Sequence, residues 1–114
     1  MAVTLTAFTN EVQLPATELS LVVAGSSETK FLGSIYMFNT SSSNVEVTLW
    51  LNQSTTTGTT GSGSNEAFIG TIPAQSGKKV TLLGSQVVGK SMKLSGKAAT
   101  ASVVNVFISG TTET

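Results

Sequence analysis

The chain of 114 residues contains no cysteine, histidine, aspartate or arginine. It therefore lacks thiolates for disulfides and metal sites, the commonest catalytic base, and the side chain that grips phosphate with two parallel hydrogen bonds. Zinc sites and histidine-based catalytic triads are excluded for the same reason. From these absences we predict a protein that is not a hydrolase, a metalloenzyme or a strong nucleic-acid binder.

Charged residues and long apolar runs are also scarce. Charged residues make up 11% of the chain, compared with about 25% in an average soluble domain. The longest aliphatic run, Leu21–Ala24, is far shorter than the roughly 20 residues that a membrane-spanning helix requires. The lysines have no arginines or interleaved aromatic row beside them, as a nucleic-acid platform would need. We therefore expect neither a membrane nor a nucleic acid as a partner.

The few charges are segregated along the chain, although the net charge is zero. Residues 1–66 carry five glutamates and one lysine, whereas residues 67–112 carry five lysines and no acid. One interpretation is a lysine-bearing surface that keeps sheet edges soluble. The other is that two oppositely charged faces meet between neighbouring subunits.

The apolar residues recur at every second position, which is typical of β-strands and not of helices. In residues 44–53, one face would carry Val45, Val47, Leu49 and Leu51, and the other Glu46, Thr48, Trp50 and Asn52. Near the C-terminus, Val104, Val106 and Ile108 alternate with Val103, Asn105 and Phe107. We therefore expect Val47, Leu49, Val106 and Ile108 to face the core.

Residues 31–38 are apolar on both faces. Alternation places Phe31, Ile35 and Met37 on one face and Leu32, Tyr36 and Phe38 on the other. A strand with two apolar faces is typical of one that is covered on two sides. Most of the aromatic residues in the chain would accordingly occupy core positions.

Turn-forming residues divide the chain into seven or eight such segments. The expected strands are 3–8, 18–23, 31–38, 44–53, 67–72, 79–83, 91–95 and 103–108. This pattern predicts an all-β protein, a single antiparallel β-sandwich domain over residues 1–114 with a jelly-roll or Greek-key arrangement. Residues 54–65 contain only Ser, Thr, Gly and Asn, so we expect a flexible hairpin loop there.

Residues Gly84–Ser91 match the phosphate-binding pattern G-x-x-x-x-G-K-[ST]. A true P-loop opens onto a helix whose N-terminus faces the phosphates. Here the following residues alternate as a strand, and no aspartate is available to hold magnesium. We therefore expect a β-turn with a surface lysine, Lys90, and no nucleotide site.

Trp50 departs from the core pattern because it shares a face with Glu46 and Thr48. Such a tryptophan can anchor a subunit contact, stack on a sugar or pack under a neighbouring loop. For Phe107, on the last expected strand, the same choice between a packed position and a contact position is open. No residue is assigned a catalytic, cofactor-binding or metal-ligating role, and the candidate interface residues are Glu46, Thr48, Trp50, Lys78, Lys79 and Phe107.

A series of segments spans roughly residues 28–110. These are Lys30–Ile35 (KFLGSI), Phe38–Ser42 (FNTSS), Val45–Leu49 (VEVTL), Ile72–Gly77 (IPAQSG) with Val80–Leu82, and Ala101–Gly110 (ASVVNVFISG). In this order they resemble a widespread group of small β-sandwich virion proteins encoded by tailed bacteriophages. The acidic residue that is usual in the penultimate turn of that group is missing, and Gly89-Lys90-Ser91 stands there instead.

The resemblance implies a non-enzymatic structural protein of the virion. Its leading version is a capsid decoration (cement) protein that binds the capsid shell as a homo-oligomer such as a trimer. The partners would be the major capsid protein or other virion proteins, and the protein would be made in the bacterial host cytoplasm and end in the virion. The alternatives are a neck, tail or fibre accessory protein and, from another class, a carbohydrate-binding β-sandwich module.

Overall fold

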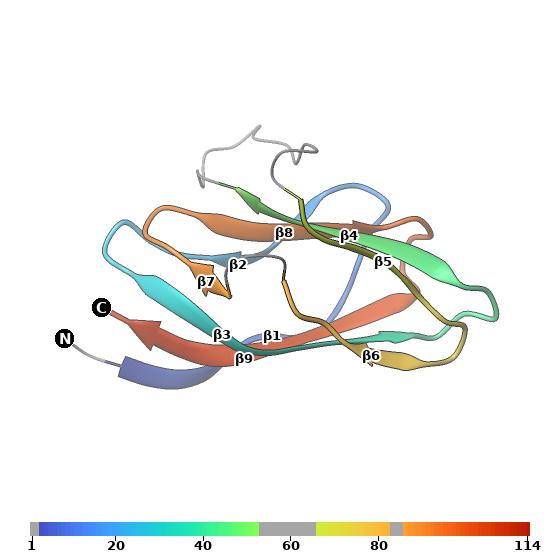
Figure 1. The fold of residues 1–114 in the computed structure, drawn as a ribbon, viewed down its shortest axis with the longest axis horizontal. Coiled ribbons are helices and arrows are strands. Elements are labelled where there is room, and N and C mark those ends of the chain that lie inside the picture. Colours follow the sequence, from blue (N-terminus) through green and yellow to red (C-terminus); the bar gives the residue numbers. More distant parts are fainter. Residues whose placement is uncertain (1–2, 53–65, 83–85) are drawn as a thin grey trace.

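A computed structural model describes residues 3–52, 66–82 and 86–114. Within these ranges the chain forms nine β-strands and no helix (Figure 1). The strands are β1 (Val3–Gln13), β2 (Leu19–Val23), β3 (Thr29–Asn39), β4 (Val45–Asn52), β5 (Glu66–Ile72), β6 (Gly77–Lys79), β7 (Val87–Val88), β8 (Lys93–Ala98) and β9 (Val104–Glu113). The loop predicted at residues 54–65 lies outside the described residues.

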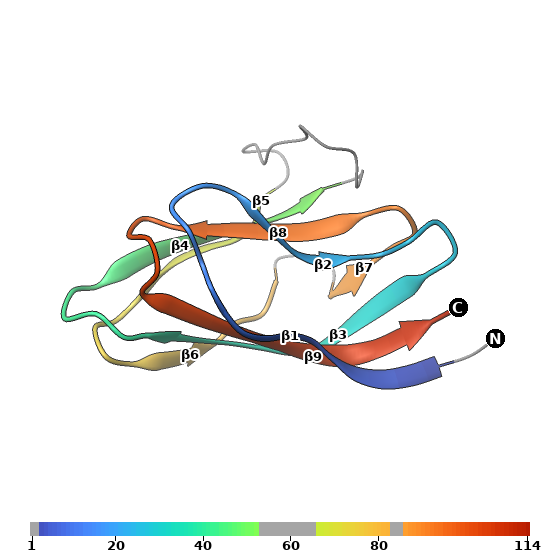
Figure 2. The same cartoon turned by 180° about the vertical axis from the view of Figure 1, so that it is seen from behind.

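The strands form two antiparallel sheets that pack face to face (Figures 1 and 2). Sheet A has the order β1-β9-β3-β6, with the short β7 also paired to β3, and sheet B has the order β2-β8-β4-β5. The pairs β1–β9, β2–β8, β3–β6 and β4–β5 are nested, as in a long hairpin that is wrapped around itself. This is the arrangement of a jelly roll, so the predicted all-β sandwich is confirmed.

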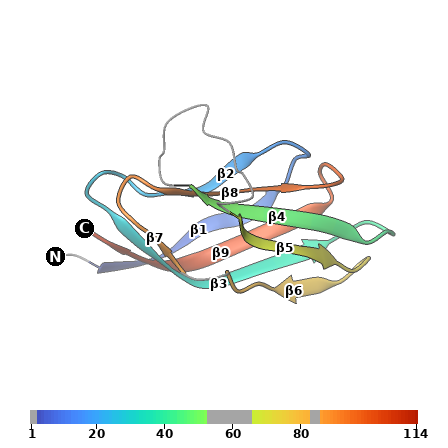
Figure 3. The ribbon, with the colours of Figure 1, turned by 45° about the horizontal axis from the view of Figure 1, so that its top comes forward.

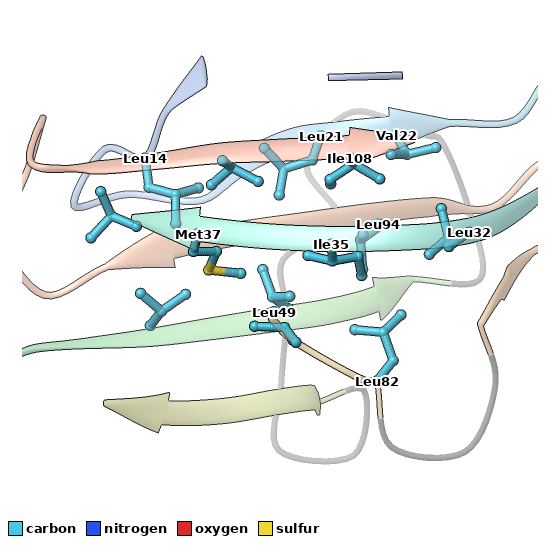
Figure 4. Close-up of a cluster of buried hydrophobic side chains, with 14 of the residues drawn as sticks. Leu14, Leu21, Val22, Leu32, Ile35, Met37, Leu49, Leu82, Leu94 and Ile108 are labelled. Atoms are coloured by element: carbon cyan, nitrogen blue, oxygen red, sulfur yellow. The ribbon is translucent and has the colours of Figure 1, made fainter. Parts of the chain in front are cut away.

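The core lies between the two sheets, and the side chains predicted to face it do so. Val47 and Leu49 from sheet B and Val106 and Ile108 from sheet A are all buried. Figure 4 shows Leu49 in this cluster, together with apolar side chains from both sheets. Complete burial of an aliphatic side chain contributes about 1.5–3 kcal/mol, so these positions dominate the stability of the sandwich.

The start of β3 differs from the expected alternation. The register between β3 and β9 shifts between Leu32 and Ser34, which is a β-bulge at Gly33. A bulge adds one residue to a strand and so reverses the facing of the residues before it. Leu32 is therefore buried and Phe31 is exposed, the opposite of the facing that strict alternation predicted for these two residues.

The lysine-rich part of the chain is divided differently from the prediction. The strand expected at 79–83 ends at Lys79, although Val80 N–H still donates to the Ile35 carbonyl at 2.8 Å. The strand expected at 91–95 continues through Gly96 to Ala98. A Cβ atom on Gly96 would lie 2.6 Å from a Leu49 methyl group, so this glycine makes room for core packing and does not end the strand.

The unpredicted β7 supplies the ninth strand. It pairs with β3 at Lys30 and Phe31, whereas β6 pairs with β3 from Tyr36 to Phe38. Both short strands therefore lie along the same edge of β3, β7 beside its start and β6 beside its end (Figure 3). Two residues are too few to give a readable alternation in the sequence.

Two turns, residues 39–44 and 73–77, are docked on each other at one end of the sandwich. The buried Asn39 side chain donates from Nδ2 to the carbonyls of Ser43 (2.8 Å) and Ile72 (3.0 Å). Its Oδ1 atom accepts from the backbone N–H of Ser41 at 2.9 Å. In return, Gln75 N–H donates to the Ser41 carbonyl at 3.1 Å. The turns are thus held by hydrogen bonds that cross from one to the other.

Candidate functional site

The six candidate interface residues do not form one site. Glu46, Thr48 and Trp50 alternate with the buried residues of β4 and so lie on the outer face of sheet B. Phe107 lies on the outer face of sheet A, and sheet A is the opposite layer of the sandwich (Figure 1). Lys79, directly opposite Tyr36 on the neighbouring strand, points to the same side as Phe107.

Lys78 lies on neither outer face. It points to the open side of the sandwich, between the edge strands β5 and β6. Its Nζ atom lies 5.6 Å from the centre of the Phe68 ring, which packs against the core. This is a cation–π contact that partly covers the edge of the core. The side chains of Lys78 and Lys79 therefore point to opposite faces of the strand, as expected for successive residues.

On the outer face of sheet B, Trp50 is only 8% exposed. The Lys97 Nζ atom lies 5.9 Å from the centre of its ring, and Thr48 beside it is also buried. Little of the ring is therefore available to a sugar or a neighbouring subunit. This exposure favours the packed ring among the three interpretations of Trp50, and a subunit contact at this face stays a prediction.

The charges that are segregated in the sequence are brought together within the sandwich. Strand β8, which carries Lys93 and Lys97, lies between β2 and the Glu46-bearing β4 in sheet B. On the same face, Ser95 donates a hydrogen bond from its hydroxyl to the Glu18 carboxylate. In sheet B, strands from the glutamate-rich half of the sequence therefore alternate with strands from the lysine-rich half. Opposite charges already lie on neighbouring strands within one subunit, and a charged contact between subunits stays a prediction.

The outer face of sheet A carries a group of aromatic side chains, most of which were expected in the core and one of which, Phe107, was a candidate interface residue. We call it the aromatic face, and its members are Phe31, Tyr36, Phe38 and Phe107. Tyr36 and Phe107 are directly opposite on β3 and β9, with ring centres 6.2 Å apart and planes tilted by 42°. Phe31 is 40% exposed and Tyr36 is 39% exposed. The signal that pointed to this face was the two-sided apolar pattern of residues 31–38.

The Tyr36 ring is held in place by the neighbouring strand β6. A Cβ atom on Gly77 would lie 1.7 Å from the Tyr36 hydroxyl oxygen, so the ring rests directly on the backbone of this glycine. Because Gly77 has no side chain, the tyrosine ring can lie flat along the surface in the space that a side chain would occupy. The aromatic face is therefore fixed in shape at Tyr36, one of its two most exposed rings.

The described part of the P-loop-like motif, residues 86–91, is a short strand and a turn. Met92 N–H donates to the Gly89 carbonyl at 3.1 Å, and Ser91 has a φ of 60°. Lys90 is exposed at the tip of this turn, and β8 follows at Lys93. The expected β-turn with a surface lysine is confirmed, and Gly84 and Ser85 lie outside the described residues.

Within the ranges that the structure covers, no three acidic, histidine or cysteine side chains are grouped to hold a metal ion. In the same ranges no helix has the length and apolar character to cross a membrane. The chain matches no protein-family model, no curated protein and no solved structure in the comparisons made with each.

Proposed function

We propose that the protein is a non-enzymatic structural component of a bacteriophage virion, with capsid decoration as the leading role. It would bind the major capsid protein or a neighbouring virion protein as a homo-oligomer. The observation that carries the proposal is that two quoted segments of the resemblance, Phe38–Ser42 and Ile72–Gly77, meet in space. They are joined by the buried Asn39 side chain, so the resemblance corresponds to a structural unit of the fold and not to scattered residues.

The fold adds a second, weaker argument. Jelly rolls are frequent among viral capsid domains, but also among lectins, so the fold alone does not decide the function. The exposed aromatic side chains of the surface are of the kind found in contacts between proteins. Exposed aromatic rings beside few charges, as at Phe31 and Tyr36, resemble the composition of interface centres.

The carbohydrate-binding alternative relies on Trp50 and Tyr36. These residues lie on the outer faces of different sheets, and Trp50 is largely buried. They do not face one sugar together, as a stacking platform would require. A glycan-array signal that disappears in Trp50→Ala would nevertheless favour this alternative over the virion role.

The proposal is tested on particles of the phage that encodes the protein. Particles are purified on density gradients, and the ratio of this chain to the major capsid protein is measured by quantitative mass spectrometry. A decoration protein should be present at a fixed ratio near the capsid copy number, and density for it should appear on the shell. A ratio of a few copies per particle would favour the neck or tail version, and absence from the particles would overturn the proposal.

A further inference from the structure

We propose that the aromatic face of sheet A is the surface through which the protein associates with a second copy of itself. The two copies would pack face to face around a two-fold axis, with the strands of one antiparallel to those of the other. This inference deepens the proposed function, on which it rests for its biological setting, by naming the oligomer contact.

The first argument is that the aromatic face is apolar, exposed and, at Tyr36, rigid. Phe31 and Tyr36 are each about two-fifths exposed. Tyr36 lies beside the half-buried Phe38 and Phe107, and Phe31 lies further along the same face, beyond the Ser34–Ser109 pair. The Tyr36 ring is already fixed on Gly77, so it loses little freedom on binding. Preordered aromatic side chains of this kind carry most of the affinity in protein interfaces.

The second argument comes from the two-sided pattern of residues 31–38. Sheet B covers the inner face of β3, where Leu32, Ile35 and Met37 are buried. Among the elements that the structure describes, none covers the outer face at Phe31 and Tyr36. A second copy would supply the cover that the sequence pattern predicts.

The third argument is the size of the face. Sheet A places four strands side by side, and its longest strands have 11 residues. The edge strands are short, with three residues in β6 and two in β7. With about 3.3 Å per residue and about 4.8 Å between strands, the five strands of the sheet together cover roughly 600 Å². A stable interface buries about 800 Å² on each partner. The whole face is smaller than this standard size but exceeds the roughly 500 Å² per partner that a specific interface needs at minimum, so it has room for one contact and not for two.

The fourth argument sets the orientation. Lys79 lies level with Phe107, whereas Glu113 lies six residues further along β9 on the same face. An antiparallel two-fold contact brings the Lys79 end of one copy over the Glu113 end of the other. A parallel two-fold contact would instead bring the two Glu113 side chains together. Opposite charges favour the first arrangement and like charges oppose the second.

The association is measured by sedimentation velocity of the purified protein over a range of concentrations. Phe31→Ser and Tyr36→Ser should each raise the dissociation constant roughly tenfold or more. The matched control is Ile69→Ser, which removes an apolar side chain that is even more exposed, at 52%, from the outer face of sheet B and should leave association unchanged. Thermal unfolding of each variant identifies any loss that comes from misfolding.

Charge reversal and cross-linking test the orientation. Lys79→Glu should weaken association, and Lys79→Glu combined with Glu113→Lys should restore it. Because the chain has no cysteine, single-cysteine variants give clean disulfide cross-links. Ser109→Cys, near the middle of the face on β9, should cross-link between copies, whereas Thr71→Cys on sheet B should not.

A wild-type protein that stays monomeric at every concentration, or association that depends on Ile69 and not on Phe31 and Tyr36, would overturn the inference. Failure of the double charge variant to recover would overturn the antiparallel orientation. A monomeric protein that still co-purifies with particles would contradict this inference alone. A dimer that is absent from particles would contradict the virion role alone.

Discussion

The side-chain amide of Asn39 donates a hydrogen bond of 3.0 Å to the backbone carbonyl of Ile72, 33 residues further along the chain. Asn39 ends β3 of sheet A, and Ile72 ends β5 of sheet B. One buried side chain therefore ties the two sheets together at one end of the sandwich. It does so while it also shapes its own turn, through Ser41 and Ser43.

We expect Asn39→Ala to destabilise the protein strongly. A buried polar group that loses its partner costs about 1–3 kcal/mol, and this change leaves the Ile72 carbonyl and the Ser41 N–H without the bonds they make now. Asn39→Asp should be at least as harmful, because it places a carboxylate against two carbonyl oxygens. Urea unfolding measures the loss. The control is Asn44→Ala, whose exposed bond to Ala74 N–H should matter less, and equal losses would contradict this account.

Leu49→Ala should lower the free energy of unfolding by about 2–5 kcal/mol, the usual cost of truncating a leucine in a core. Leu49 is completely buried between the sheets. Its neighbour Thr48 faces the other way, and Thr48→Ala should cost much less because fewer packed atoms are removed. Chemical denaturation of both variants checks this, and similar losses would mean that the facing of β4 is wrongly assigned.

Gly77→Ala should destabilise the protein because the new methyl group would occupy the place of the Tyr36 ring. The cause is tested with a double-mutant cycle. In a Tyr36→Ala background, Gly77→Ala should cost much less, since the space above the glycine is then free. Near-UV circular dichroism should also change in Gly77→Ala as the tyrosine moves. A cost that is the same in both backgrounds would assign the effect to the β6 backbone instead.

Ser102→Gly should stabilise the protein by up to about 1 kcal/mol. Ser102 is exposed and has a φ of 63°, a left-handed conformation that costs residues with a Cβ atom roughly 1–2 kcal/mol. Glycine adopts it without that strain but loses more chain entropy on folding. Thermal unfolding measures the gain. Ser109→Gly, within strand β9, is the control and should destabilise, because glycine loses more chain entropy in a strand.

The strands could be predicted because alternation is a local property of the sequence. Residues 44–52 illustrate this, since the expected inward residues Val45, Val47 and Leu49 are buried in the core and Leu51 packs against it. The bulge at Gly33 could not be predicted in this way. Its register depends on the close approach of β3 to Gly110, where a Cβ atom would lie 1.9 Å from the Phe31 carbonyl oxygen. That contact joins residues almost eighty positions apart.

The surfaces were harder to predict than the core. Alternation placed Trp50 correctly on an outer face, but the number of atoms that cover an outward side chain depends on distant parts of the chain, and the ring is largely buried. Conversely, Phe31 and Tyr36 looked like core residues because they are apolar. Which face of a two-sided strand is covered depends on how the sheets pack, and that is not a local property.

The place of β9 in sheet A has a consequence for the way the protein reaches its fold. β9 is the last strand along the chain, yet it lies between β1 and β3 and pairs with both. Until β9 has left the ribosome, β1 lacks its partner in sheet A and β3 is open along one edge. Pairing Val3 with Glu113 closes a loop of almost the whole chain, and such long-range pairing slows folding to milliseconds or seconds. Synthesis thus leaves a period in which two long, lysine-poor strand edges are exposed to aggregation.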